Sequence, residues 1–370
     1  MAKNHSRVTE SEKKRKKKKV KRNRFMAKVF VVLLVIGAVA FIGDHFLSGM
    51  FNKGEQIDND IKTAEELKDD VVNILVCGID WDESRSSANT DVILYVSCDV
   101  KNKKVSAFQI PRDTYVGEEL GGGGKINSVY SHGKKENQIM NLVDVINKKL
   151  GLPVDHYVTL DMDAFISMVD AIDGGLDMFV PYPVILKDKN TGREETIIEE
   201  PGWYKVDGYL AEKIVRNRNY PNSDVQRLEV QSYFYASLVK YFTENLNVSD
   251  FIKIMSRFTQ YLTTDMHWTK IASLAQFAFS VEYEDMVIIK PSLHGYDVLK
   301  PGAKNPTNVL VCEEQQWADY LNEYCRPHQE PKSADELSMP TNPPAGEIVR
   351  DHGVTNSSVM TIADILSKTE

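Results

Sequence analysis

The sequence predicts an α/β fold: a mixed central β-sheet flanked by helices, preceded by one transmembrane helix. Three observations support this fold class. Short apolar runs that end at a glycine or a proline recur through the chain, as buried strands do. Longer segments repeat apolar residues three and four positions apart, which is the spacing of one helix face. A single apolar stretch follows directly on a strongly basic N-terminus.

The N-terminal region divides into a basic arm, residues 1–25, and a transmembrane anchor, residues 26–48. Residues 1–28 contain 13 Lys or Arg and 2 Asp or Glu, a balance of +11. The unbroken apolar core at 29–43 is shorter than the roughly 20 residues that span a bilayer, but further apolar residues extend it. Because no A-x-A motif follows, an uncleaved anchor is favoured over a cleaved signal peptide. The positive-inside rule then predicts a single-pass protein of the cell membrane, with its N-terminus cytoplasmic and the rest extracytoplasmic.

The alternative interpretation of the basic arm is a nuclear or nucleic-acid-binding tail. The formal charge of −8, less the +11 of residues 1–28, leaves −19 on the rest of the chain. An acidic body argues against nucleic acid as a partner. An anionic substrate would therefore need a local cluster of basic residues.

The four cysteines, Cys77, Cys98, Cys312 and Cys325, all lie in the part that is expected outside the cell. Disulfides persist in that environment. The absence of a C-x-x-C motif weakens zinc and thioredoxin-like interpretations, and both buried free thiols and two local disulfides stay open.

A polar, acidic stalk at 49–71 leads into one large domain at 72–325. Strands are expected at 72–80, 91–100, 104–113, 156–161, 175–180 and 285–290, and helices at 139–150, 163–172, 207–216, 224–242, 249–258 and 268–280. Residues 308–325 are expected to form a strand and then a helix. A proline-rich linker at 326–347 precedes a short strand–helix fragment or tail at 348–370, which is too short to bury a core alone.

Familiar catalytic motifs are incomplete in this sequence. The run GGGGK at 121–125 is not a P-loop, because Glu119 and Ile126 stand where a glycine and a hydroxyl are required. No G-x-S-x-G, H-E-x-x-H or G-x-G-x-x-G motif occurs. The plain interpretation of these glycines is a flexible loop; the alternative is that they let a bulky ligand approach the backbone.

Two aspartates mark the ends of neighbouring predicted strands. Asp91 stands at the entrance to one strand, and Asp113 follows Arg112 at the exit of the next. If these strands pair antiparallel, both carboxylates lie on one rim of the sheet. They would repel unless a cation lay between them, and their hard oxygen atoms suit Mg²⁺. The plainer interpretation is a pair of solvated strand-end aspartates that cap turns.

A second cluster is basic. Arg216, Arg218 and Arg227 lie within twelve residues of an otherwise acidic body. In an extended segment Arg216 and Arg218 share one face, and Arg227 shares a helix face with Gln231. Guanidinium groups bind phosphate in pairs of hydrogen bonds and stay charged. The plainer interpretation is a surface cluster paired with acidic residues.

Taken in order, these segments resemble the LytR-CpsA-Psr family of cell-wall glycopolymer ligases. The stretches that carry the resemblance are NILVCGID, NTDVIL, IPRDTYV, KINSVYSHG, GLPVDHYVTLD, DGGLDMFVP and RNRNYPNSDVQRLEVQ. IPRDTYV followed by KIN is highly specific in combination. The resemblance spans residues 72–325, implies the sandwich fold of that family, and agrees with a basic arm before a single anchor.

The resemblance also implies roles for individual residues. Asp91 and Asp113 would bind the metal, Mg²⁺ or Mn²⁺, and would be catalytic together with Arg112. The substrate-binding set implied by the resemblance is Arg112, Lys125, Arg216, Arg218, Arg227 and Gln231.

The sequence departs from the family pattern at two positions. The first motif usually reads Arg-Ser-Asp-Thr, and here Asn89 replaces the arginine while Asp91 is kept. Arg85 is a candidate substitute from the adjacent loop. Val230 stands where an arginine usually precedes the glutamine, so fewer substrate contacts are expected.

The activity implied by the resemblance is a phosphotransferase-type ligation. A teichoic acid, capsule or secondary wall polysaccharide would pass from a polyprenyl-diphosphate carrier to a peptidoglycan sugar hydroxyl, forming a phosphodiester. The lipid is expected between the apolar helices at 163–172 and 224–242. Expected partners are the lipid-linked donor, peptidoglycan and the cytoplasmic membrane, and not nucleic acid. Two alternatives stay open: a polyprenyl-diphosphate hydrolase, and a non-catalytic lipid-phosphate-binding regulator of envelope assembly.

Overall fold

The computed structural model describes residues 70–82, 87–133, 137–187, 191–220, 223–245, 262–266, 270, 273–274, 277–278 and 280–369. The predicted arm, anchor and stalk lie outside these residues, as do the helix expected at 249–258 and much of that at 268–280. No helix in the described part of the chain combines the length and the apolarity needed to cross a bilayer.

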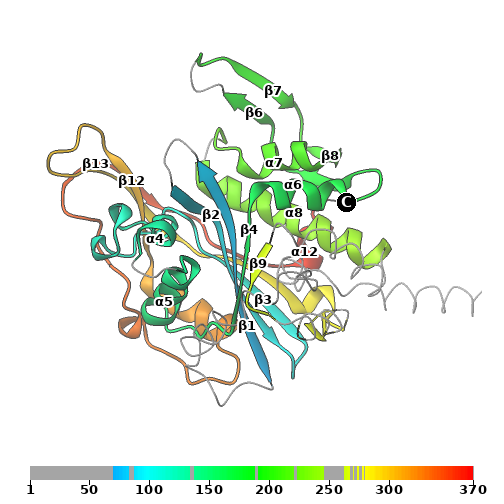
Figure 1. The fold of residues 1–370 in the computed structure, drawn as a ribbon, viewed down its shortest axis with the longest axis horizontal. Helices are drawn as coiled ribbons and strands as arrows, with labels where there is room; N and C mark the ends of the chain where they lie inside the picture. The colour runs from blue at the N-terminus through cyan, green and yellow to red at the C-terminus, as the bar shows by residue number, and fades with distance from the viewer. Residues whose placement is uncertain are drawn as a thin grey trace, which may run out of the picture.

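A mixed seven-stranded sheet forms the centre of the fold (Figure 1), in the order β14-β10-β3-β2-β1-β4-β9. Its strands are β1 (Val71–Asp82), β2 (Ser87–Asp99), β3 (Lys104–Gln109), β4 (His156–Leu160), β9 (Leu262–Thr264), β10 (Met286–Lys290) and β14 (Ser358–Thr361). β1, β2 and β3 pair antiparallel, whereas β1 with β4 and β3 with β10 are parallel. This arrangement confirms the predicted mixed sheet.

Helices cover both faces of this sheet (Figure 1). One face carries α6 (Met162–Asp170), α7 (Gly208–Arg216), α8 (Ser223–Asn245) and α12 (Ile362–Ser367), and the other carries α4 (Ile126–His132), α5 (Ile139–Lys149) and α11 (Glu314–Tyr320). Alternate residues of β1 point to opposite layers, since Ile74 joins the first core and Leu75 the second. Burial on both faces explains why these strands read as continuous apolar runs.

Smaller sheets surround this body. β11 (Leu293–Leu299) lies between β12 (Thr307–Cys312) and β13 (Glu347–Val354), and β5 (Leu176–Val180) pairs with β8 (Gly202–Val206). β6 (Val184–Lys187) and β7 (Glu194–Ile198) form a hairpin that projects at the top of Figure 1. This hairpin was not expected from the sequence, because its second strand is mostly exposed and begins with two glutamates instead of an apolar run.

The C-terminal segments pack onto the body instead of forming a separate spacer and fragment. Leu337 and Met339, in the segment expected to be a linker, are buried in the α4–α5 core. β14 is an edge strand of the central sheet, and Ile362 and Ile365 of α12 join the core around α8. Since these segments have too few apolar residues for a core of their own, they complete that of the main domain.

All four cysteines are free and buried. This finding selects buried thiols over the two local disulfides that the sequence left open. Burial raises the pKa of Cys98, Cys312 and Cys325 to about 12, so these thiols stay protonated at neutral pH.

Candidate active site

A tight turn directly after β3 presents Arg112 and Asp113. The backbone N–H and the hydroxyl of Thr114 both donate to the carbonyl of Pro111, at 3.0 and 2.6 Å. The Leu310 N–H donates to the Asp113 carbonyl at 3.0 Å, which ties the turn to β12. The two charged side chains therefore project from a braced turn at the rim of the sheet.

Asp91 reaches the same rim through a β-bulge. The pairing of β1 with β2 jumps from Gly78–Val92 to Ile79–Thr90, so Asp91 is the extra residue of β2. The sequence placed Asp91 at a strand entrance, whereas it lies four residues inside a longer strand. The antiparallel register of β2 and β3, extended beyond their paired residues, brings position 91 opposite position 112.

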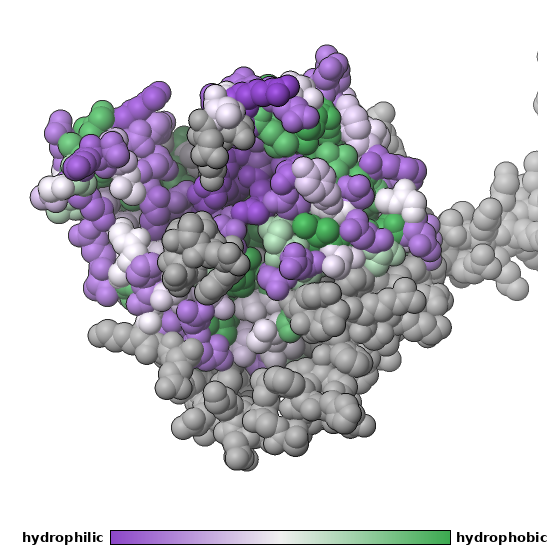
Figure 2. Space-filling model, turned by 45° about the horizontal axis from the view of Figure 1, so that its top comes forward, coloured by the Kyte–Doolittle hydropathy of each residue, from purple (hydrophilic) through white to green (hydrophobic). Residues whose placement is uncertain are grey.

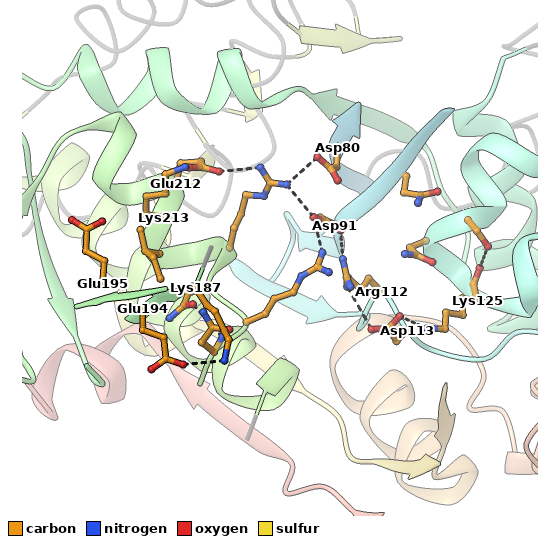
Figure 3. Close-up of a pocket in the computed structure, with 18 of the residues that line it drawn as sticks. Asp80, Asp91, Arg112, Asp113, Lys125, Lys187, Glu194, Glu195, Glu212 and Lys213 are labelled. Carbon is orange, nitrogen blue, oxygen red and sulfur yellow. Dashed lines mark hydrogen bonds and ion pairs between the residues drawn. The ribbon is translucent and has the colours of Figure 1, made fainter. Parts of the chain in front are cut away.

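Arg112 joins the two aspartates. Its guanidinium donates from Nη1 to Oδ1 of Asp91 at 2.6 Å, and its Nε lies 3.5 Å from Oδ2 of Asp113 (Figure 3). All three side chains are only 12–13% exposed. The structure thus brings together the residues that the sequence predicted as the catalytic and metal-binding set.

Lys125 reaches Asp113 from the end of the glycine loop, with Nζ 2.7 Å from Oδ1 (Figure 3). The loop folds back on itself through its four glycines. Gly121, Gly122, Gly123 and Gly124 all have φ between 54° and 82°, a region that favours glycine. The Val116 N–H donates to the Gly124 carbonyl at 2.8 Å, which closes the loop and positions Lys125.

Two arginines approach Asp91 from the segment after α7. The Nη2 atoms of Arg216 and Arg218 lie 3.7 and 3.5 Å from Oδ2 of Asp91. Arg216 is also held by Asp80 and Glu212, each at 2.9 Å (Figure 3). These distances place Arg216 and Arg218 on the same side of the rim as Arg112.

Asp80 and Glu212 are two site residues that were not predicted from the sequence. Asp80 lies near the end of β1, just after its buried apolar run, and an aspartate at the end of an apolar run is the signal that could have identified it. Glu212 stands four residues before Arg216 on one helix face, the spacing of an ion pair within a helix. Both carboxylates orient Arg216 toward the rim.

Arg227 and Gln231 lie on the buried side of α8, with exposed fractions of 2% and 5%. The Gln231 amide donates to the Val215 carbonyl at 3.2 Å and so fixes the end of α7 just before Arg216. Arg227 is close enough to act electrostatically on both Asp91 and Asp113. Val230 is fully buried in the apolar core, and Arg85 lies outside the described residues.

Charge balance keeps both aspartates ionised. Burial alone would raise the pKa of Asp91, but the charge and hydrogen bond of Arg112, with Arg218 and Arg227, lower it below its usual value. Burial likewise opposes ionisation of Asp113, and Lys125 and Arg112 outweigh it, so this pKa is also lowered. The site therefore presents two carboxylate anions among several fixed cations at neutral pH.

A cleft of about 2000 Å³ opens above this rim, and Figure 2 shows a hollow lined by hydrophilic side chains. Among the described residues, the basic side chains that line it are Arg112, Lys125, Lys187, Arg193, Lys213, Arg216 and Arg218. The acidic ones are Asp80, Asp91, Asp113, Glu194, Glu195 and Glu212. Seven basic and six acidic groups give a balance of +1 in a body of charge −19. A cleft with a balance of +1 repels an anionic ligand less than the rest of this acidic domain does.

A second, narrow and largely apolar pocket lies beneath the rim, between α6, α8 and the sheet. Phe165, Met168, Phe234 and Tyr235 are among the residues that line it. Its lining also includes Asp80, Asp91 and Arg216, which line the charged cleft as well.

Within the described residues, no three His, Cys, Asp or Glu side chains gather as a metal-holding group.

Comparison with known proteins identifies relatives of this chain. It is 28% identical over 216 residues to the polyisoprenyl-teichoic acid–peptidoglycan teichoic acid transferase TagV of Bacillus subtilis, covering 57% of this chain and 54% of that protein. It is 26% identical over 208 residues to Biofilm regulatory protein A of Streptococcus mutans, covering 52% and 50%. The chain thus spans about half the length of the curated relatives it matches.

Two solved structures share the fold. The crystal structure of B. subtilis TagV superposes with a TM-score of 0.54 at 24% identity, covering 69% of this chain and 97% of that chain. Protein gbs0355 from Streptococcus agalactiae gives 0.54 at 18% identity, covering 77% and 94%. At these identities the likeness shows the fold alone. The LytR_cpsA_psr family model matches residues 45–308, well over half of the sequence, and the chain therefore belongs to the LytR-CpsA-Psr family.

Proposed function

We propose that this protein transfers a glycopolymer from a polyprenyl-diphosphate carrier to a sugar hydroxyl of peptidoglycan, forming a phosphodiester. One observation carries the proposal: the charged cleft and the apolar pocket share Asp80, Asp91 and Arg216 in their linings. A ligand that fills both needs an anionic head and an apolar tail, and a lipid diphosphate has both. The teichoic acid transferase among the relatives supports the same chemistry.

In the proposed reaction, the acceptor oxygen attacks the phosphorus that carries the glycan. The bond from that phosphorus to the bridging oxygen breaks, and the lipid monophosphate leaves with the electron pair. Negative charge then gathers on the leaving phosphate, where Arg112, Arg216 and Arg218 would hold it. Guanidinium groups suit this role because they stay charged and contact phosphate oxygens in pairs.

Mg²⁺ or Mn²⁺ is the proposed cofactor, and Asp91 and Asp113 are the residues that would hold it. Their ionised oxygens are the donors that these ions prefer, and Mg²⁺ in phosphate-processing sites is commonly held by one or two carboxylates together with water and substrate phosphate. The chemistry of this donor pair therefore fits the ion. When bound, it would neutralise charge on the diphosphate.

Asp91 and Asp113 are also the candidate acceptors for the hydroxyl proton. Since neighbouring basic groups lower both pKa values, the two carboxylates are weak bases near neutral pH. We therefore expect charge neutralisation by the arginines to contribute more to the rate than proton abstraction does.

The lipid would enter the apolar pocket between α6 and α8, which are the helices expected at 163–172 and 224–242. The pocket has a free volume of about 90 Å³, enough for only a few water-sized spheres. An inserted lipid must therefore displace side chains such as Phe165 or Phe234. A polyprenyl carrier lies in a membrane, so we propose that residues 26–48 anchor the protein there with the domain on the extracytoplasmic side.

The direct test incubates the full-length chain with Mg²⁺ and a polyprenyl-diphosphate glycan, with and without peptidoglycan oligomers. The proposal predicts a glycan–peptidoglycan conjugate and release of lipid monophosphate only when the acceptor is present. Diphosphate cleavage without conjugate would establish the hydrolase instead. Ligand that is retained unchanged would establish the non-catalytic lipid-phosphate-binding regulator instead, and one relative is named as a regulatory protein.

Two variants sharpen this test. Arg218→Gln removes a guanidinium that lines the cleft beside Asp91, so conjugate formation should fall sharply while the fold is kept. Lys148→Gln is the matched control, because Lys148 is 75% exposed on α5. Within the part of the chain that the structure describes, its ion pair is with Asp144 of the same helix. Equal losses from both variants would contradict a role for the cleft.

A further inference from the structure

Helix α7 presents a stripe of side chains to the cleft that leads away from the rim. Tyr209, Lys213 and Arg216 stand at positions i, i+4 and i+7 and all line the cleft, while Ala211 and Ile214 of the same helix are buried in the core. Seven residues of α-helix advance about 10 Å along the axis. The backbone of Tyr209 therefore lies about two helical turns from that of Arg216, whose guanidinium we assign to the diphosphate.

Tyr209 is unusual among the large apolar and aromatic side chains of the described residues. Five of them are strongly exposed: Trp203, Tyr209, Ile348, Val349 and Val354. Tyr209 is the most exposed, at 63%, and of these five it is the one that lines the cleft. A scattered exposed side chain needs no explanation, but an exposed ring inside the charged cleft of a folded domain does.

The surroundings of the ring are polar. Lys213 Nζ lies 4.9 Å from the centre of the Tyr209 ring, and Lys213 also pairs with Glu212 at 2.9 Å. The β6–β7 hairpin lines the same cleft with Lys187, Glu194 and Glu195 (Figure 3). An aromatic face bordered by hydrogen-bond donors and acceptors of both charges is poorly suited to a lipid chain.

The hairpin is coupled to the arginine segment. The Asn219 side chain donates from Nδ2 to the carbonyl of Ile185 in β6 at 2.9 Å, and Asn219 directly follows Arg218. Tyr182 and Tyr220 also pack together at the base of the hairpin, with ring centres 6.0 Å apart. The hairpin, the arginines and α7 thus form connected walls of one cleft.

We propose that Tyr209 and Lys213 form a sugar-binding subsite for the substrate glycan. This inference rests on the proposed function. The apolar C–H face of a pyranose ring would lie on the Tyr209 ring, and its hydroxyls would bond to Lys213 and the hairpin carboxylates. Amphipathic aromatic side chains give large contact area with little loss of conformational freedom, which suits a ligand with one apolar face. The same chemistry is present in the donor glycopolymer and in the peptidoglycan acceptor.

The test measures binding instead of transfer, using the full-length chain. Two oligosaccharide probes without diphosphate, one from a wall glycopolymer and one from peptidoglycan, are titrated into wild type, Tyr209→Ala and Tyr209→Phe. We expect Tyr209→Ala to weaken binding of one probe roughly five- to tenfold, as loss of an aromatic contact does, and Tyr209→Phe to retain most of it. The probe that responds identifies the donor or the acceptor as the source of the sugar.

Two controls make the oligosaccharide-binding result interpretable. Trp203→Ala removes an exposed aromatic ring that does not line the cleft, so it should leave oligosaccharide binding unchanged. Binding of polyprenyl diphosphate should be unchanged in Tyr209→Ala, and this measurement reports on the proposed function separately. Equal oligosaccharide binding by wild type and Tyr209→Ala, or no binding of either probe by wild type, would overturn the subsite even if diphosphate binding is intact.

Discussion

Arg112 and Asp91, which are 21 residues apart in the sequence, meet at 2.6 Å on the rim of the central sheet. The pairing depends on two local irregularities. The bulge in β2 directs Asp91 outward, and the turn after Pro111 directs Arg112 toward it. The same guanidinium also lies 3.5 Å from Asp113, so one cation holds two carboxylates beside the cleft.

The first prediction concerns this shared cation. Arg112→Gln should lower the rate of glycan transfer by about 10²–10³, because a group that stabilises developing charge is lost. It should also lower the free energy of unfolding, since Asp91 and Asp113 are both largely buried and would lose a shared partner. Transfer kinetics and denaturant unfolding measure the two effects separately. A variant with unchanged transfer would contradict the role given to Arg112.

The second prediction separates backbone strain from crowding in the glycine loop. An alanine Cβ at position 124 would lie 2.5 Å from the Tyr115 ring, whereas at position 123 it would meet only the flexible Lys300 amine at 3.8 Å. Both residues have positive φ, so Gly123→Ala should cost about 1–2 kcal/mol from strain alone. Gly124→Ala should cost more and should displace Lys125, which lowers transfer. Equal destabilisation of the two variants in urea titrations would show that the Tyr115 ring and the backbone at Gly117 and Glu118 move aside at little cost.

Acid should destabilise the protein through the two rim aspartates. Their pKa values in the folded state are lowered from 3.8, so their contribution is present above that value and is lost as the pH falls through the lower folded values. The contribution of these two groups to the free energy of unfolding should therefore be nearly constant from neutral pH to about pH 5. It should decrease at pH values below about 4. Asp91→Asn should flatten the acid limb of the profile. An unchanged limb in that variant would contradict the ion pairing.

Lys290 provides a prediction about stability. It is 7% exposed at the end of β10, and burial lowers its pKa below 10.5 although the charge of Glu229 opposes this. The charged form is thus disfavoured by folding, and this cost is present at neutral pH and disappears as the pH rises above the unfolded value. Lys290→Met should raise the free energy of unfolding on the order of 1 kcal/mol at neutral pH.

The control for this variant is Lys148→Met, which changes an exposed lysine and should alter stability little. The gain from Lys290→Met should shrink in alkaline buffer. Destabilisation by Lys290→Met would contradict this prediction. It would indicate that the attraction between Lys290 and Glu229 stabilises the fold by more than the burial of the Lys290 charge costs.

The mixed sheet and the convergence of Asp91 and Asp113 on one rim could be predicted from the sequence because both depend on patterns within short segments. Buried strands appear as apolar runs, and antiparallel pairing brings the start of β2 to the end of β3. The approach of Arg216 to the same rim required the resemblance to a family, since no local pattern joins residue 91 to residue 216.

Other features were missed for physical reasons. The β6–β7 hairpin depends on backbone pairing between mostly exposed residues, which leaves little apolar signal. The fold of the glycine loop is set by its positive φ angles and by the Val116–Gly124 hydrogen bond, and GGGGK alone does not specify either. Leu337 and Met339 are two apolar residues in a proline-rich segment, and their burial depends on the core that receives them.

The central claim is that arginines distant in sequence converge to hold a diphosphate. The most direct measurement is calorimetric binding of a short-chain polyprenyl diphosphate and its monophosphate, with Mg²⁺, to wild type and Arg218→Gln. We predict that wild type prefers the diphosphate and that Arg218→Gln loses roughly 10- to 100-fold in affinity for it, the effect of one charge-assisted contact. Equal affinity of wild type for both ligands, or diphosphate affinity unchanged by Arg218→Gln, would contradict the claim.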